Sequence, residues 1–325
     1  MRVLALCVLL ATFKVAFSQS DTLSITLENV KYSYPVNLFP LKIENQDLRM
    51  AYMDVPPAGK GNGRTVMLFH GKNFAGYYWT NVIRALTKAG FRVIVPDQIG
   101  FGKSSKPFIR YSFHELAHQN KKLLDSLAVG KITVVGHSMG GMLATRFALL
   151  YPDRVEKLIL ENPIGLEDYR TFVPYTSPEE QYQAELKATA QSIRQYYQGS
   201  YFPSWKPEYE WLVEIAAGVT RSADFPRAAK VAALTYEMIY EQPVVYEFPL
   251  LKVPTTLIIG TEDRTIVGKN KLSKDLQQRY GNYKVLGKEI SAKIPGSTLV
   301  ELNAGHIPHI EKPEEFIKAL LTAVR

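Results

Sequence analysis

The stretch VVGHSMGGMLA, residues 134–144, places a histidine and a serine between glycines where one apolar run ends and another begins. Gly136, Ser138 and Gly140 form a GxSxG pattern, with a predicted buried strand before it and a predicted helix after it. A strained turn at such a junction can hold a serine hydroxyl clear of the backbone, and side chains at the two glycines would clash with the strand and the helix. The GxGxxG and Walker lysine patterns of phosphate-binding turns are absent from the sequence. We therefore interpret Ser138 as a nucleophile.

Short apolar runs alternate with helical periodicity along most of the chain. With 325 residues and 46% hydrophobic composition, the chain can bury a full core. Most predicted strands are continuously apolar, as expected of parallel strands that are covered on both faces. The alternation predicts an α/β fold with a doubly wound, mostly parallel sheet. Strands are predicted at residues 65–71, 91–97, 132–138, 157–163, 255–260 and 297–305, and helices at residues 79–89, 112–127, 139–150 and 311–324.

Two segments depart from this alternation. Residues 34–55 alternate in polarity and turn, which predicts antiparallel strands at one edge of the sheet. Residues 166–251 are charged, aromatic and helical in period, and Ser177 with Pro178 is typical of a helix start. We therefore predict a core made of residues 19–165 and 252–325, with a helical cap at residues 166–251.

A serine hydroxyl is a poor nucleophile near neutral pH, so it needs a base, and a third group must hold that base in one tautomer. The segment NAGHIPHIEKPEEF, residues 303–316, supplies His306 directly after a predicted strand. The segment GTEDRTIVG, residues 260–268, supplies Asp263 just past another. Ser138, Asp263 and His306 are thus the predicted nucleophile, acid and base, in that order along the chain.

Five segments together resemble the α/β-hydrolase fold serine hydrolases that carry a cap. The resemblance covers essentially all of the chain after residue 18, and it implies that the backbone amides of Lys72 and Met139 form the oxyanion hole. It also implies that Asp97 shapes its loop, and we expect His70 to support the HG loop by hydrogen bonding. The segments are HGKNF (70–74), PDQIGFGKS (96–104), GHSMGG (136–141), GTED (260–263) and AGHIPHIEKPEEF (304–316).

The acid has alternatives. Glu161 also ends a predicted strand, at the position from which haloalkane dehalogenases draw their acid, and Glu262 is a third candidate. Asp263 is favoured because its loop matches the commoner acid loop of the resemblance. His306 and His309 are three residues apart and could suggest a metal pair, but no third ligand with suitable spacing follows and HExxH is absent. No metal and no cofactor are expected.

The predicted reaction is hydrolysis of a carboxylic ester of a small, hydrophobic substrate through an acyl-enzyme. Hydrolases of C–C bonds in ring-fission products, lactonases and aminopeptidases share this set of residues and stay open as alternatives, and a non-catalytic binding protein is a further one. Epoxide hydrolases and haloalkane dehalogenases need an aspartate where this chain has Ser138. Aromatic residues of the predicted cap either line an apolar pocket or form the cap's own core: Tyr196, Tyr197, Tyr201, Phe202, Trp205, Tyr209 and Trp211.

The first residues predict a secretory signal peptide, residues 1–18, and export to a periplasm or out of the cell. An apolar run at residues 3–13 follows Arg2, and Lys14 ends that run well short of the roughly 20 residues that a bilayer span needs, so no stable membrane anchor is expected. The only cysteine, Cys7, lies in this segment, so no disulfide is expected. Basic residues are scattered although the net charge is +8, which argues against nucleic acid and leaves a small-molecule substrate as the expected partner.

Overall fold

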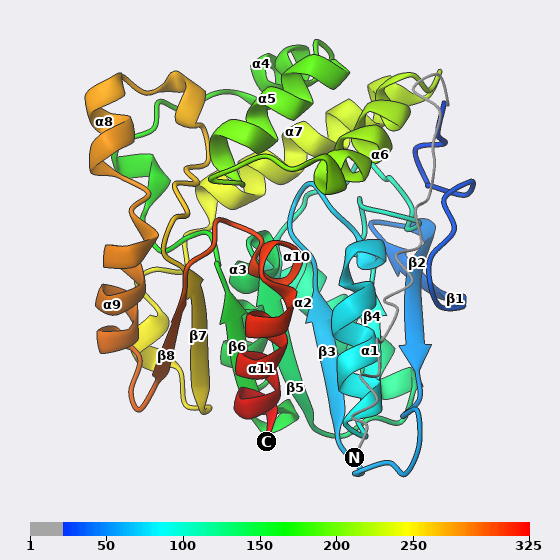
Figure 1. The fold of residues 1–325 in the computed structure, drawn as a ribbon. Helices are drawn as coiled ribbons and strands as arrows, with labels where there is room; N and C mark the ends of the chain where they lie inside the picture. The colour runs from blue at the N-terminus through cyan, green and yellow to red at the C-terminus, as the bar shows by residue number, and fades with distance from the viewer. Residues whose placement is uncertain (1–21) are drawn as a thin grey trace, which may run out of the picture.

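The computed structural model describes residues 22–325, so the predicted signal peptide lies outside the described residues. Eight strands form one sheet in the order β1-β2-β4-β3-β5-β6-β7-β8. β1 and β2 are antiparallel at one edge, and every pair from β4 to β8 is parallel (Figure 1). This confirms the predicted fold class and the antiparallel edge. The strands are β1 (Val36–Ile43), β2 (Gln46–Val55), β3 (Thr65–Phe69), β4 (Arg92–Pro96), β5 (Ile132–His137), β6 (Val155–Glu161), β7 (Thr255–Gly260) and β8 (Thr298–Leu302).

Helices cover both faces of the sheet, which explains why the strands are apolar throughout. Along β3, Val66 and Leu68 pack into one buried cluster, whereas Met67 and Phe69 pack into the other. Successive side chains of a strand point to opposite faces, so a strand that is covered on both needs apolar residues at every position. The first cluster includes α1 (Thr80–Lys88) and α11 (Pro313–Val324), and the second includes α2 (Phe113–Ser126), α3 (Met139–Leu150) and α9 (Tyr283–Lys293).

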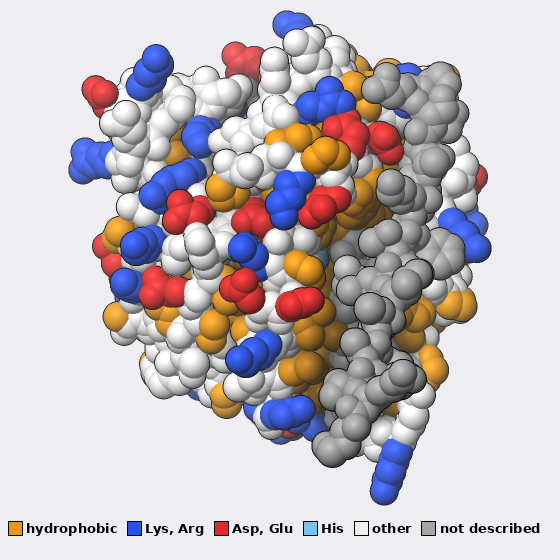
Figure 2. Space-filling view, viewed as in Figure 1, with side chains coloured by type: hydrophobic (Ala, Val, Ile, Leu, Met, Phe, Trp, Pro, Cys, Tyr) orange, Lys and Arg blue, Asp and Glu red, His pale blue; other side chains and the backbone are white. Residues whose placement is uncertain are grey.

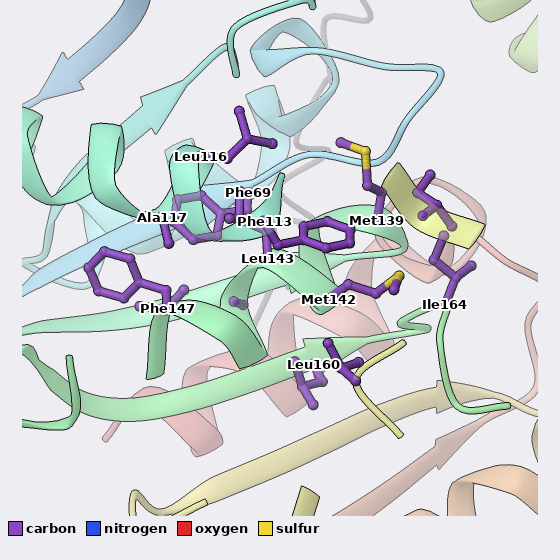
Figure 3. Close-up of a cluster of buried hydrophobic side chains, with 14 of the residues drawn as sticks. Phe69, Phe113, Leu116, Ala117, Met139, Met142, Leu143, Phe147, Leu160 and Ile164 are labelled. Atoms are coloured by element: carbon purple, nitrogen blue, oxygen red, sulfur yellow. The ribbon is translucent and has the colours of Figure 1, made fainter. Parts of the chain in front are cut away.

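The second cluster seats α3, the helix that follows Ser138. Figure 3 shows side chains of α2 and α3 interdigitating above the sheet, with Phe69 of β3 among them. The rings of Phe69 and Phe147 meet edge to face with centroids 6.1 Å apart. Met142, Leu143 and Phe147 are fully buried, and burying each such side chain contributes roughly 1.5–3 kcal/mol. This packing fixes the start of α3 against the ends of β3 and β5.

The region between β6 and β7 is helical and lies over the carboxyl ends of the strands, at the top of Figure 1. The Ser177 hydroxyl accepts from the Glu180 backbone, and the Glu180 carboxylate accepts from the Ser177 N–H, so the sequence-predicted helix start is a capping box. The elements are η3 (Tyr169–Thr171), α4 (Pro178–Glu185), α5 (Ala190–Ser200), η4 (Pro207–Tyr209), α6 (Glu210–Thr220), α7 (Phe225–Glu241) and η5 (Phe248–Leu250).

Helices between β7 and β8 were not predicted. In α9, Gly287 interrupts the helical pattern, and its missing side chain lets the helix approach β7, because a Cβ there would lie 3.1 Å from Ile259. Glycine inside a helix is roughly 1 kcal/mol less favourable than alanine, which lowers the helix propensity of this segment. Packing against the sheet therefore decides the structure here. The other unpredicted elements are short: η1 (Gly76–Trp79), η2 (Pro152–Arg154), η6 (Lys269–Lys271), α8 (Lys274–Arg279) and α10 (Pro308–Glu311).

The surface of the described part mixes charges of both signs. Figure 2 shows Lys and Arg side chains interspersed with Asp and Glu side chains on the face that carries α11. No helix within residues 22–325 combines the length and the apolar character that crossing a bilayer requires.

The close approach of β5 and α3 at Gly136 leads to a first prediction. A Cβ at Gly136 would overlap the carbonyl oxygen of Gly140 and lie 2.8 Å from the Cβ of Ala144, whereas a Cβ at Gly130 would meet nothing within 4 Å. We expect Gly136→Ala to lower the free energy of unfolding by more than about 2 kcal/mol and Gly130→Ala to change it by less than about 1 kcal/mol. Urea unfolding of both variants measures this. Equal midpoints for the two variants would contradict the packing described.

Candidate active site

Ser138 sits at a strained bend between β5 and α3. Its backbone angles are φ 56° and ψ −121°, a region that side-chain-bearing residues rarely adopt. Three backbone hydrogen bonds hold the bend: Ser138 N–H donates to Glu161 O (3.2 Å), and Ser138 O accepts from Gly141 N–H (2.9 Å) and Ile164 N–H (3.2 Å). The backbone N–H and C=O of Ser138 are thus both used in hydrogen bonds, and its side chain projects from the bend.

The register of the sheet brings the loops that carry the candidate residues to one edge. Phe69 pairs with Gly136, and Glu161 pairs with both His137 and Ile258. From β3 the chain goes to β4 on one side and then to β5 on the other, so the strand order reverses at the carboxyl ends of β3 and β5. Ligands of open α/β sheets bind outside such a reversal, and Ser138 lies there.

Ser138, His306 and Asp263 form a continuous hydrogen-bonded set. His306 Nε2 is 2.9 Å from Ser138 Oγ, and His306 Nδ1 is 2.6 Å from Asp263 Oδ2. The exposed fractions of the three residues are 5%, 0% and 1% for Ser138, His306 and Asp263. Because the Asp263 carboxylate only accepts, Nδ1 carries a proton, and the Nε2 lone pair of a neutral His306 faces the serine hydroxyl. This arrangement can draw the proton from Ser138.

Two further donors fix the Asp263 carboxylate. Thr265 N–H donates to Oδ1, and Asn162 Nδ2 donates to Oδ2, each at 2.8 Å. Asn162 also accepts from Gly260 N–H at 2.8 Å, so it ties the end of β6 to the acid loop. Sequence reasoning missed Asn162, because the predicted strand at residues 157–163 ran through it, whereas β6 ends at Glu161 and leaves Asn162 as the first residue of the loop.

The alternative acids lie apart from His306. Glu161 is fully buried and accepts two hydrogen bonds at 2.9 Å, one from the backbone N–H and one from Nδ1 of His309. The Glu262 side chain is exposed, and its residue contributes a backbone hydrogen bond to Ala304 O. The structure therefore pairs Asp263 with His306 and Glu161 with His309. In the described residues no group of three or more His, Cys, Asp and Glu side chains is arranged to hold a metal ion.

The HG loop after β3 presents its backbone to the bend. His70 accepts from Gln98 N–H at Nε2 (3.0 Å), so its Nδ1–H donates to Gly71 O (2.9 Å). The peptide bond is trans, so fixing the Gly71 carbonyl aims the Lys72 N–H the opposite way. A Cβ on Gly71 would lie 3.1 Å from Ser138 Cβ, which shows how closely this loop approaches the bend.

Met139 carries the second backbone amide that the resemblance implied for an oxyanion hole. It is the first residue of α3, where an N–H has no intrahelical partner and the helix dipole favours an anion. The side chain of Lys72 is used elsewhere, 3.6 Å from the Glu185 carboxylate of α4. The Met139 amide therefore directly follows Ser138, while the lysine ammonium links the HG loop to the helical region above it.

Tyr201, at the end of α5, contacts the base and the HG loop at once. Its carbonyl accepts from His306 N–H at 2.8 Å, and its ring stacks on the imidazole with centroids 4.7 Å apart. Its hydroxyl accepts from Asn73 Nδ2 at 2.7 Å. The stacked pair of Phe202 and Tyr209, 4.2 Å apart, is instead buried among apolar residues. Phe202 and Tyr209 thus belong to the buried core of the helical region, and Tyr201, which lies in the same cluster, also contacts the candidate base.

Asp97 shapes the loop after β4. Its carboxylate accepts from Gly76 N–H (2.6 Å), Lys103 N–H (2.7 Å) and the Tyr32 hydroxyl (2.7 Å). Nearby, Lys106 Nζ donates to the carbonyls of Gly102 (2.7 Å) and Ser104 (2.9 Å), and burial lowers the pKa of this lysine to about 7. The acid and the amine therefore order the loop from two sides.

The comparisons with known proteins identify the family. Residues 64–313 match the family model of the alpha/beta hydrolase fold, so the chain belongs to this family of hydrolases. The crystal structure of a probable hydrolytic enzyme from Pseudomonas aeruginosa PAO1 has a TM-score of 0.93 to this structure, with 47% identity over 95% of this chain and 100% of that one.

Curated relatives match in part. A 2-hydroxy-6-oxo-6-phenylhexa-2,4-dienoate hydrolase of Burkholderia cepacia is 39% identical over 33% of this chain and 38% of its own. Epoxide hydrolase 2 of Siraitia grosvenorii is 33% identical over 36% of this chain and 38% of its own. The chain spans about a third of the length of the curated relatives it matches.

The pairing of Asp263 with His306, and of Glu161 with His309, leads to a second prediction. We expect Asp263→Asn to slow labelling of Ser138 by a fluorophosphonate probe at least about 100-fold, because the asparagine amide no longer holds His306 in the required tautomer. Glu161→Gln is the matched control and should slow labelling by no more than about tenfold. Labelling rates, with circular dichroism to check folding, measure this. A larger loss in Glu161→Gln would assign the acid to Glu161.

The buried amine of Lys106 leads to a third prediction, on how the free energy of unfolding depends on pH. Its pKa is about 7 in the folded chain and 10.5 for an ordinary lysine, so the unfolded state binds more protons between those values. Stability contributed by this group therefore rises as pH rises above 7. Replacing the amine by methionine, Lys106→Met, should flatten the rise of unfolding free energy between pH 7 and about pH 9.5. Urea unfolding at several pH values measures both slopes, and identical slopes would refute the expectation.

Proposed function

We propose that the chain is a serine hydrolase that cleaves a carboxylic ester of a small, hydrophobic substrate through an acyl-enzyme. One observation carries the proposal: His306 Nε2 lies 2.9 Å from Ser138 Oγ while Asp263 holds the opposite ring nitrogen at 2.6 Å. A nucleophile, a base and an orienting acid within hydrogen-bond reach are the parts that acyl transfer needs.

The proposed reaction starts with attack of Ser138 Oγ on the ester carbonyl, with His306 Nε2 taking the hydroxyl proton. Negative charge then develops on the former carbonyl oxygen, and the amides of Lys72 and Met139 receive it. Losing one such donor typically costs about 3–4 kcal/mol of transition-state stabilisation. The His306 imidazolium next protonates the leaving alcohol, and water cleaves the acyl-enzyme by the same steps in reverse.

The helical region over the site gives the reaction a dry environment. Ser138 is 5% exposed and His306 is fully buried, so little of the reacting pair is open to water. Its contacts with the site include Tyr201 on His306 and Glu185 on Lys72. Excluding water strengthens every charge interaction inside the site. The aromatic rings around Tyr201 favour an apolar acyl or alcohol group.

Other reactions of the same residues are ranked below ester hydrolysis. The Burkholderia cepacia relative is named as a hydrolase of 2-hydroxy-6-oxo-6-phenylhexa-2,4-dienoate, so ring-fission diketones are the second candidate class. Lactones and aminoacyl amides follow. The Siraitia grosvenorii relative is named as an epoxide hydrolase, but epoxide opening of that kind needs a carboxylate nucleophile where this chain has Ser138. A binding role without catalysis would leave the Ser138–His306–Asp263 geometry unexplained.

A substrate panel tests the proposal. Wild type, Ser138→Ala and the surface control Ser126→Ala are assayed with p-nitrophenyl esters, lactones, aminoacyl amides and ring-fission diketones. We expect esters to be the best substrates, Ser126→Ala to match wild type, and Ser138→Ala to lose about 10⁴-fold or more in kcat. Equal turnover by Ser138→Ala would overturn the serine mechanism, and a faster diketone would transfer the proposal to C–C bond hydrolysis.

A further inference from the structure

A buried chain of hydrogen bonds behind Ser138 joins three loops of the site. Gly71 N–H donates to the Tyr78 hydroxyl at 2.9 Å. Tyr78 Oη lies 2.9 Å from His137 Nδ1, and His137 Nε2 lies 2.8 Å from His306 O. The chain therefore runs from the HG loop, through the residue before the nucleophile, to the backbone of the base.

The two ends of this chain fix where every proton lies. A carbonyl only accepts, so His137 Nε2 carries a proton toward His306 O. Burial is the main reason that the pKa of His137 lies well below its usual range, so His137 is neutral and Nδ1 accepts. Burial and Glu161 raise the pKa of Tyr78, so its hydroxyl keeps its proton and donates to Nδ1. One arrangement satisfies all four groups.

Other residues of the described part of the chain enclose Tyr78 and His137. Tyr78 is 4% exposed and His137 is fully buried. The Tyr78 ring stacks on Phe74 with centroids 4.9 Å apart and meets Trp79 and His309 edge to face at 4.8 and 4.6 Å. Removing one of these hydrogen bonds would leave buried donors and acceptors without partners, which costs roughly 1–3 kcal/mol of stability for each unpaired group.

We propose that Tyr78 and His137 are positioning residues that hold the oxyanion loop and the base loop in register around Ser138, an inference that rests on the proposed function. Neither side chain touches the reacting atoms. Tyr78 acts through Gly71, whose neighbour Lys72 supplies one oxyanion amide, and His137 acts through the backbone of His306. Displacing preorganised donors by a fraction of an ångström weakens the transition state more than the bound substrate.

The test removes one oxygen. Tyr78→Phe keeps the packed ring but leaves Gly71 N–H and His137 Nδ1 without partners. The matched control is Tyr77→Phe, because the neighbouring tyrosine of η1 has its hydroxyl outside this chain of bonds. With active sites counted by phosphonate titration, we expect Tyr78→Phe to lower kcat about 10- to 100-fold with KM within about threefold, and Tyr77→Phe to stay within about twofold of wild type.

A double variant separates a positioning role from a general loss of structure. If Tyr78 and His137 act as one unit, the double variant of Tyr78→Phe with His137→Gln should lose no more kcat than the worse single variant. A Tyr78→Phe kcat within twofold of wild type would overturn the inference. So would losses that multiply in the double variant.

A measurement without turnover keeps the inference distinct from the proposed function. Nitrogen-15 NMR of labelled histidines reports the tautomer of His137 in wild type between about pH 5.5 and 9. We expect a neutral ring with an exchange-protected Nε2–H across this range, and a charged ring or an Nδ1–H tautomer would overturn the inference. A protein that hydrolysed nothing in the panel yet showed this tautomer would refute the proposed function while supporting the hydrogen-bonded chain.

Discussion

The positive φ of Ser138 is the constraint on which the site depends. A serine forced into this conformation stays there only if its surroundings hold it, and they do so through contacts that leave no room for side chains. A Cβ at Gly136 would overlap Gly140 O, and a Cβ at Gly140 would overlap Phe69 O. The bend therefore packs directly against the end of β3 and the start of α3. The buried cluster that includes α2 and α3 holds these elements in place (Figure 3).

His306 is held at every polar position except the one that faces the serine. Its N–H donates to Tyr201 O, its carbonyl accepts from His137, and its Nδ1 donates to Asp263. Three residues later, His309 is bound by Glu161 at both its backbone and its ring. The base loop is thus fixed from the sheet on one side and from the helical region on the other. Nε2 is the remaining free acceptor, which suits proton transfer with Ser138.

Much of this could be predicted from sequence, because the decisive features are local. GxSxG sits between a continuous apolar run and a helical one, which suffices to predict the bend, and the loops of Asp263 and His306 follow predicted strands. The sheet and its antiparallel edge follow from apolar periodicity. The core and cap boundaries and the signal peptide stay predictions from the same pattern.

The contacts that sequence reasoning missed join residues that lie far apart along the chain. Asn162 reaches Asp263 across 101 positions, and Tyr201 holds His306 through a backbone carbonyl that no residue pattern records. Tyr78 belongs to a run of aromatic residues in η1 that reads as ordinary core. α9 was missed because Gly287 weakens the helical pattern while fitting the helix against Ile259. Tertiary packing, which a single sequence does not display, decides each of these.

We infer that the bend between β5 and α3 makes one serine nucleophilic. Peptide mapping by mass spectrometry after treatment with a p-nitrophenyl phosphate triester tests it most directly. We expect one phosphoryl adduct per chain, carried by Ser138, with loss of ester hydrolysis in proportion to its formation. An unmodified Ser138 in protein that has lost its activity, or an adduct on Ser138 in protein that keeps it, would contradict the claim.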